Sequence, residues 1–155
     1  MLFINHATDI KAEKDYLTQH LSRSDYTRDA PEIAGQWHGR AAELLELSGS
    51  LDQESYFRLC ENINAATGET LTPRTKAERR VLYDFTFDVP KSVTLAYQLG
   101  GDERIGGAFD EPVAETMGEI EDAMEVRVRK NGSRDSRDSR SMVWADFRHR
   151  QRLAL

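Results

Sequence analysis

Hydrophobic and polar residues alternate strictly over residues 83–88. Tyr83, Phe85 and Phe87 fall on one side of an extended chain, and the polar residues between them fall on the other. This period of two is typical of a strand with one buried face and one polar face. A proline that suits the first turn of a helix follows the strand, and a glycine that can end the helix comes about three turns later. The pattern therefore predicts a strand that leads into a helix starting near Lys91.

The junction between this strand and this helix offers polar chemistry. Asp88 precedes the helix and can cap its free backbone amides. A helix start with a cation beside it, here Lys91, favours an anion such as a phosphate. Asp84 and Asp88, on the polar face of the strand, could serve a metal ion or a histidine. A purely structural strand and capped helix is the alternative interpretation of the same residues.

The same pattern divides the rest of the chain into further elements. Apolar residues at helical spacing predict helices over residues 10–21, 40–47 and 109–125. Another helix is expected to start at a capping box formed by Ser50 and Gln53 and to end near residue 63. Short apolar or alternating runs predict strands over residues 2–5, 126–130 and 141–147, and residues 31–39 are expected in a loop.

The last two predicted strands are expected to form a hairpin. Between them lie residues 131–140, a polar segment with a repeated Ser-Arg-Asp triplet that we expect to be a mobile polar loop. The order of elements predicts an α+β fold, most simply an antiparallel sheet with helices packed mainly on one face. Residues 1–155 are long enough for a hydrophobic core and are expected to form a single domain.

The amino-acid composition indicates the class of protein and its cellular compartment. The charged fraction of 31% and the hydrophobic fraction of 39% are ordinary for a soluble globular protein. The single cysteine, Cys60, excludes an internal disulfide and fits a reducing cytoplasm. No apolar run approaches the roughly 20 residues that span a bilayer, and the N-terminus lacks the pattern of a signal peptide. We therefore expect a cytoplasmic protein without a membrane partner.

Charge is distributed unevenly along the chain. The net charge is −6, but residues 127–155 hold nine Lys or Arg and three Asp, a balance of +6. The preceding 126 residues therefore carry −12. Such asymmetry predicts a basic surface on an acidic body, with Arg127, Arg129 and Lys130 at its start. This surface is interpreted either as a phosphate-binding patch or as a solvated arginine-rich loop.

Two motifs resemble one family. Residues 84–94 read D-F-T-F-D-V-P-K-S-V-T, similar to the signature of the TrwC/TraI-type (MobF-class) conjugative relaxases. Residues 37–49 read W-H-G-R-A-A-E-L-L-E-L-S-G, similar to a second segment of that family. The resemblance covers nearly the whole chain. It implies a relaxase fold like that of rolling-circle initiators, and a protein that nicks one DNA strand at a plasmid transfer origin through a tyrosine.

The resemblance also assigns roles to residues. It places the nucleophile at Tyr16 and a second tyrosine, used in strand transfer by some members, at Tyr26; each assignment could shift by one position. It places an orienting aspartate at Asp84 and the first of three metal-binding histidines at His149. The metal expected in the complete family domain is divalent, Mg or Mn. Single-stranded DNA at a transfer origin is the expected partner.

The chain departs from the family after His149. The other two metal histidines belong to an H-x-H strand, and the 155 residues contain no such motif. A shortened chain, a degraded gene or a reading-frame shift would each explain this ending. We expect an incomplete sheet with an unpaired edge through which the chain could self-associate, no bound metal, and no activity of the chain alone. The alternatives are a non-catalytic module that binds single-stranded DNA through Lys91 and residues 127–152, and an inert gene remnant.

Overall fold

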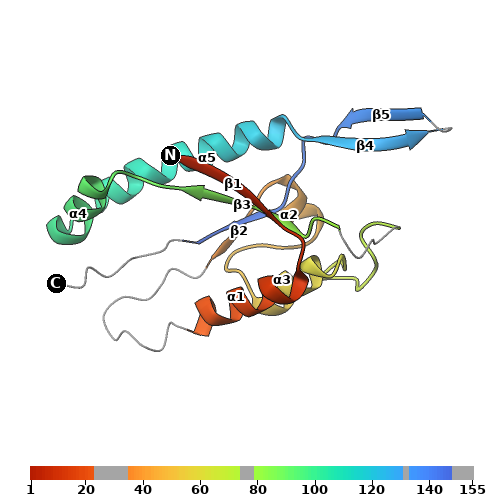
Figure 1. Ribbon diagram of the computed structural model, residues 1–155, viewed down its shortest axis with the longest axis horizontal. Coiled ribbons are helices and arrows are strands. Elements are labelled where there is room, and N and C mark those ends of the chain that lie inside the picture. Colours follow the sequence, from red (N-terminus) through yellow and green to blue (C-terminus); the bar gives the residue numbers. More distant parts are fainter. Residues whose placement is uncertain (23–34, 74–78, 131–132, 148–155) are drawn as a thin grey trace. The chain divides into compact units, whose positions relative to one another are not determined.

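The computed structural model describes residues 1–22, 35–73, 79–130 and 133–147, with side chains except at 19–22, 127–130 and 133–138. The elements in chain order (Figure 1) are β1 (Leu2–Ala7), α1 (Ile10–Ser22), β2 (Gln36–His38), α2 (Arg40–Leu44), α3 (Gln53–Cys60), β3 (Leu82–Phe87), α4 (Lys91–Gly100), α5 (Glu103–Asp122), β4 (Glu125–Lys130), β5 (Ser133–Asp138) and β6 (Trp144–Asp146). The described strands form three pairs, β1 with β3, β2 with β6, and β4 with β5. The predicted α+β class is confirmed.

The chain divides into two compact units. One contains Met1–Asn5 and Asp84–Met142, and the other contains His6–Tyr83 and Val143–Leu155. Each unit is therefore built from segments that are distant in sequence. That residues 1–155 form a single domain stays a prediction.

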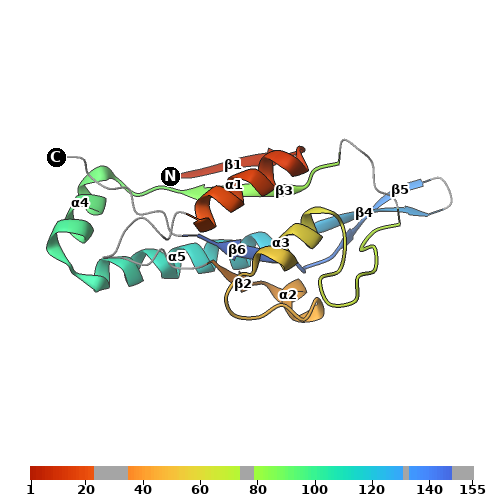
Figure 2. The ribbon, with the colours of Figure 1, turned by 90° about the horizontal axis from the view of Figure 1, so that it is seen from below.

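The second unit holds the main hydrophobic core. Its members are contributed by α1, β2, α2 and the chain that follows α2: Leu17, Trp37, Ala42, Leu47 and Leu51. Helices α1 and α3 lie side by side (Figure 2), joined by an ion pair between Lys14 and Glu61 and by a 3.1 Å hydrogen bond from Gln53 Nε2 to Thr18 Oγ1. Helix α1 follows its predicted bounds closely because its apolar spacing is local and regular.

The start of α3 differs from the prediction. Its N-cap is Asp52, whose carboxylate accepts a 2.7 Å hydrogen bond from the Ser55 amide. The predicted capping box of Ser50 and Gln53 is therefore wrong, because the carboxylate directly before the helix satisfies the free amide instead.

Residues 36–38, expected in a loop, form β2 and pair with β6. The register places Gln36 opposite Asp146, Trp37 opposite Ala145 and His38 opposite Trp144. The Trp37 amide also donates to the Gly49 carbonyl at 2.9 Å. The loop prediction is wrong because backbone partners from distant segments make this short run a strand.

The strand and helix predicted around residues 83–100 are confirmed as β3 and α4. The Asp88 amide donates to the Met1 carbonyl, and the Val81 amide donates to the Ala7 carbonyl, each at 2.8 Å. The start of β1 thus meets the end of β3, so the two strands run antiparallel. The N-cap of α4 is Pro90, without a side-chain capping bond. The prediction that Asp88 caps α4 is wrong, because the N-cap position falls two residues later, on Pro90, which has no capping side chain.

The alternation along β3 is only partly reflected in burial. Phe85 and Phe87 are half-buried while Asp84 and Thr86 are exposed, as the period of two predicts. Tyr83 is 47% exposed, so the aromatic face is less covered at the start of the strand.

Helix α5 begins six residues earlier than the pattern indicates. Asp102 caps it by accepting a 3.1 Å hydrogen bond from the Arg104 amide. The glycine-rich sequence after α4 contains a real stop at Gly101, whose φ of 63° is left-handed, but the next two glycines lie inside α5. Tyr97 of α4 donates a 3.2 Å hydrogen bond from its hydroxyl to Glu103 Oε2 of α5.

The hairpin pairs different segments from those expected. β4 pairs with β5, from Glu125 opposite Asp138 to Lys130 opposite Ser133. The segment 133–138, expected in a polar loop, is thus a strand, and the predicted pairing of 126–130 with 141–147 is wrong. The sequence holds Asn131-Gly132 between the two strands, a dipeptide that favours two-residue hairpin turns. The polar repeat of β5 therefore pairs with β4 through the backbone despite its low hydrophobicity.

Candidate functional site

Tyr16 lies on an outer face of α1. The contacts of Lys14 and Thr18 turn one side of the helix toward α3, and Leu17 between them is buried. At 100° per residue, Tyr16 falls on the side away from α3, and it is 51% exposed. The start of the helix is fixed by Asp9, which accepts hydrogen bonds from the amides of residues 11 and 12 at 2.8 and 3.2 Å. The capped helix α1 therefore carries Tyr16, about half exposed, on the side away from α3.

Asp84 and Lys91 lie on one continuous strand–helix segment. Asp84 is exposed on the polar face of β3, and Lys91 is the exposed first residue of α4. The amides of Val93 and Thr94 donate to the Pro90 carbonyl at 2.9 and 3.2 Å. The structure thus brings the predicted carboxylate and the predicted cation into the same unit.

The remaining predicted site residues lie wholly or partly outside what the structure describes. Tyr26 and His149 lie outside the described residues. Arg127, Arg129 and Lys130 belong to β4, where the backbone is described and the side chains are not. Their backbone register is definite, with Arg127 opposite Ser136 and Arg129 opposite Arg134.

The described residues do not fit a divalent metal site. No group of three or more His, Cys, Asp or Glu side chains that could hold a metal ion occurs among them. Asp84 therefore has no described set of partner ligands, and one carboxylate alone does not make a catalytic divalent site.

A cluster that sequence reasoning missed lies on the β2–β6 pair. Asp146 Oδ1 lies 3.0 Å from His38 Nε2, and the His38 ring stacks on Trp144 with centroids 4.2 Å apart. His38 and Asp146 are 108 residues apart in sequence, so no local spacing could have indicated the pair.

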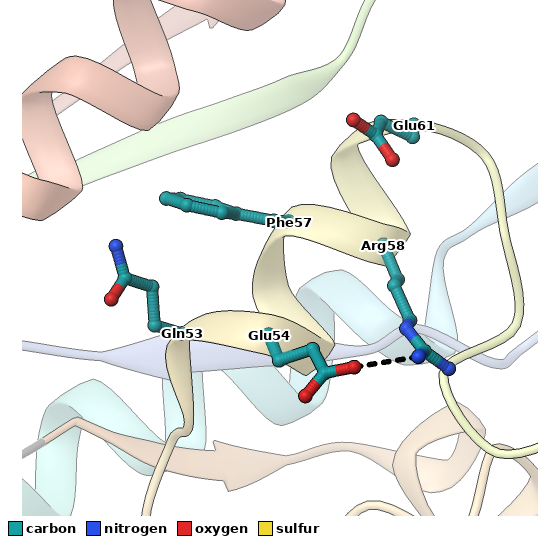
Figure 3. A pocket seen from close by; sticks show the side chains of 5 residues that line it. All are labelled: Gln53, Glu54, Phe57, Arg58 and Glu61. Atoms are coloured by element: carbon teal, nitrogen blue, oxygen red, sulfur yellow. Dashed lines mark hydrogen bonds and ion pairs between the residues drawn. The ribbon is translucent and has the colours of Figure 1, made fainter.

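A shallow pocket lies along α3 (Figure 3). It is lined by Gln53, Glu54, Phe57, Arg58 and Glu61, all from α3 and its end. Glu54 and Arg58 form an ion pair at 2.6 Å, Lys14 pairs with Glu61, and Lys14 also lies 5.0 Å from the centre of the Phe57 ring. The charged side chains that line the pocket are thus engaged in ion pairs within α3 and between α3 and α1. We therefore assign the pocket a structural role and no ligand.

Cys60 and Asp52, both outside the predicted site, have shifted pKa values. Burial raises the pKa of the Cys60 thiol to about 11, so this cysteine is a neutral core residue and no nucleophile. Partial burial acts to raise the pKa of Asp52, but the hydrogen bonds from Ser55 outweigh it and leave that pKa below its ordinary value.

Solved structures of the same architecture are DNA-bound relaxases. One of them is the conjugative relaxase TrwC in a metal-free complex with oriT DNA, which is 30% identical with a TM-score of 0.73. The match covers 96% of this chain and 50% of the TrwC chain. A metal-bound complex of TrwC with oriT DNA is 29% identical with a TM-score of 0.77, and a copper-bound one is 28% identical with a TM-score of 0.79. These likenesses place the fold in the class of conjugative relaxases.

The sequence gives the family. The family described as TrwC relaxase matches residues 10–152, and the chain belongs to it. The multifunctional conjugation protein TraI of Escherichia coli strain K12 is 34% identical over 116 residues, which are 74% of this chain and 6% of TraI. The chain thus spans a small part of that relative and about half of the solved TrwC chains. The resemblance drawn from residues 37–49 and 84–94 is confirmed.

The helices were also compared with the length and hydropathy that a membrane-spanning segment requires. In the described part of the chain, no helix is both long enough and apolar enough to cross a bilayer.

Proposed function

We propose that this chain is the tyrosine-bearing N-terminal portion of a conjugative relaxase, a site- and strand-specific DNA transesterase acting at a plasmid transfer origin. The observation that carries the proposal is the TrwC relaxase match over residues 10–152, within which Tyr16 stands exposed on the capped helix α1. The solved relatives of this fold are complexes with oriT DNA, which supports origin DNA as the substrate.

The proposed reaction is nucleophilic catalysis by Tyr16. Its phenolic oxygen attacks the phosphorus of a DNA phosphodiester, and the bond from phosphorus to the 3′ oxygen breaks. The products are a 5′-phosphotyrosine and a free 3′ hydroxyl, which takes up a proton as the phenol loses one. A tyrosine side chain in water has a pKa of about 10, so the attacking phenol must lose its proton as it attacks. Tyr26 is the proposed second tyrosine for strand transfer.

Other residues hold the DNA and orient the site. We assign Lys91, Arg127, Arg129 and Lys130 to the DNA backbone, because basic groups supply most of the affinity for phosphates. Asp84 is proposed as a positioning residue for a histidine, and His149 as a metal ligand.

A divalent metal, Mg or Mn, would polarise the scissile phosphate in the complete family domain. The described residues do not supply its site, so the steps above use only the chain's own groups. A DNA substrate and a single thiol also support a cytoplasmic location.

The test uses transfer-origin oligonucleotides and denaturing gels that reveal covalent adducts. We expect no cleavage above background from the chain alone with magnesium or manganese, because the sequence contains no H-x-H motif. Appending a family-type H-x-H segment should restore nicking, and Tyr16→Phe in that extended protein should abolish it. An adduct formed by the unmodified chain would contradict the incomplete site. Loss of nicking only with Tyr26→Phe would move the nucleophile to Tyr26.

A second candidate function is non-catalytic binding of single-stranded DNA. It is favoured by the balance of +6 over residues 127–155. Binding without an adduct in the extended protein would support it, and an adduct would exclude it.

A further inference from the structure

Aromatic and cationic side chains gather where β1 ends and β3 begins. The Val81 amide donates to the Ala7 carbonyl at 2.8 Å, which holds these two strand ends together. In the same strand pair, the rings of His6 and Tyr83 lie with their centroids 6.4 Å apart and their planes inclined by 52°. Arg80, just before β3, reaches the same tyrosine. The side chains of His6, Arg80 and Tyr83 are all exposed, so the cluster faces solvent.

The contact between Arg80 and Tyr83 holds both side chains in place. Arg80 Nη1 donates a 2.6 Å hydrogen bond to the Tyr83 hydroxyl, and Arg80 Cζ lies 5.7 Å from the centre of the ring, close enough for a cation–π attraction. A guanidinium has five N–H donors, and this hydrogen bond uses one. Within the part of the chain that the structure describes, Arg58 and Arg104 pair with carboxylates and Arg80 does not. Arg80 can therefore offer its charge to an external anion.

The preceding arginine has a different role. Arg79 is half-buried, and its Nη2 donates to the carbonyl of Cys60, the last residue of α3. Its Nη1 donates to the Arg80 carbonyl at 3.4 Å. Arg79 thus fastens the backbone ahead of β3 to the end of α3. The fold uses the first of two adjacent arginines, while the second projects from an anchored backbone into solvent.

We propose that Tyr83 and Arg80, flanked by His6, form a subsite for one nucleotide of single-stranded DNA. The base stacks on the exposed part of the Tyr83 ring, and the adjoining phosphate accepts hydrogen bonds from the Arg80 guanidinium. Stacking on aromatic rings and attraction of the phosphates are the two interactions through which proteins bind single strands without sequence preference. The choice of DNA as the ligand rests on the proposed function, and the subsite lies in the same compact unit as Tyr16.

A purely structural role for the cluster is the competing explanation. Tyr83 is 47% exposed, and in that explanation its ring only covers the end of the strand pair. The two explanations differ in one measurable property. If Tyr83 stacks on a base, the affinity lost on removing its ring depends on the presence of that base. If the ring is only structural, its removal affects the binding of every oligonucleotide equally.

The first test measures the affinity of the 155-residue chain for two oligonucleotides by fluorescence anisotropy. One is oligothymidylate, and the other has the same length but abasic sites, so that it keeps the phosphates and lacks the bases. We expect Tyr83→Leu to weaken binding of oligothymidylate about tenfold and to leave binding of the abasic strand unchanged. Tyr83→Phe keeps the ring and should retain most of the affinity. Thermal melts followed by circular dichroism check that both variants fold.

The same assay tests the phosphate contact. Arg80→Gln should weaken binding of both oligonucleotides and reduce the slope of log affinity against log salt concentration by about 0.7. Arg104→Gln is the matched control, because Arg104 is exposed, belongs to the other compact unit and pairs with Asp102. It should leave the slope unchanged. Arg80→Gln also keeps the proposal testable if Tyr83→Leu does not fold.

The second test locates the base directly. An oligonucleotide that carries 5-iododeoxyuridine forms a covalent bond to a stacked aromatic side chain on irradiation, and mass spectrometry identifies the joined peptide. We expect a crosslink at Tyr83 in the unaltered chain, a lower yield in Arg80→Gln and none at this position in Tyr83→Leu.

The proposal is overturned if Tyr83→Leu weakens binding of both oligonucleotides equally, if crosslinks form only elsewhere, or if the chain binds neither oligonucleotide at low salt. These outcomes are separate from those of the nicking assay. Nicking by the extended protein without a crosslink at Tyr83 would keep the proposed function and remove the subsite. A base-dependent loss in Tyr83→Leu without nicking would keep the subsite and remove the transesterase.

Discussion

Glu121 Oε1 accepts a 2.7 Å hydrogen bond from the backbone amide of Met142, and the Glu121 residue is only 6% exposed. This contact ties the end of α5 to the chain that leaves the β4–β5 hairpin. The amides of Ser139 and Arg140 reinforce it by donating to the Met124 carbonyl at 2.9 and 3.3 Å. A buried carboxylate thus fixes the base of the hairpin within its unit.

Replacing Glu121 tests this arrangement. We expect Glu121→Ala to lower the free energy of unfolding by about 1–3 kcal/mol, because it leaves a partly buried amide without its acceptor. Glu121→Gln keeps an oxygen at the end of the side chain and should cost less. Urea titrations followed by circular dichroism measure both variants. Equal stability of the two variants would show that the hydrogen bond is not what matters at this position.

Capping of α3 predicts a pH dependence. Asp52→Ala should cost about 1 kcal/mol at neutral pH, because the carboxylate satisfies the Ser55 amide. The pKa of Asp52 is lowered in the folded chain, so this stabilisation is present above the ordinary pKa of about 4 and is lost as the pH falls through the folded value. The difference in unfolding free energy between the two proteins should therefore shrink in acid. Asp52→Asn, which keeps an acceptor, is the matched control.

The thiol of Cys60 should be unreactive in the folded chain. The residue is 4% exposed, and burial raises the pKa of the thiol to about 11, so little thiolate forms at neutral pH. Labelling by a maleimide should be slow in buffer and fast in urea, followed by mass spectrometry. Rapid labelling without denaturant would mean that α3 opens readily.

DNA affinity should depend on salt. Each phosphate contact on a single strand contributes about 0.7 to the slope of log affinity against log salt concentration. Lys91→Ala should reduce the slope by about that amount, and Lys11→Ala on α1 should leave it unchanged. Fluorescence anisotropy with a labelled oligonucleotide at several salt concentrations measures the slopes. An unaltered slope in Lys91→Ala would remove this residue from the DNA-contacting set.

Local signals predicted the elements that depend on neighbouring residues. The apolar spacing of α1, the alternation of β3 and the glycine that follows α4 all act within a few residues, and each element lies where the pattern indicates. Family membership was readable for the same reason, since residues 37–49 and 84–94 are contiguous motifs. The position of Tyr16 on an exposed helix face also follows from α1 alone.

Features made by distant segments could not be predicted. His38 is in a strand only because Trp144 and its neighbours lie opposite, and nothing near residue 38 indicates this. Hydrophobicity misled the interpretation of β5, whose polar repeat pairs with β4 through backbone bonds. The sequence Asn131-Gly132 between the two strands is the local signal that could have indicated a short hairpin. Gly106 and Gly107 are poor helix formers, but the cap at Asp102 starts α5 ahead of them.

The separation of β2 from β6 in sequence sets an order of folding. Glu125 and Asp138 can meet as soon as a short hairpin closes, whereas His38 and Asp146 must close a loop across 108 residues. Such contacts stabilise the fold only after the entropy cost of closing the loop has been overcome. We therefore expect the β2–β6 strand pair to form after the folding transition state. Substitutions there should accelerate unfolding and leave the refolding rate nearly unchanged in stopped-flow experiments. The contact between His38 and Asp146 would then be among the last to form as the chain folds and among the first lost as it unfolds.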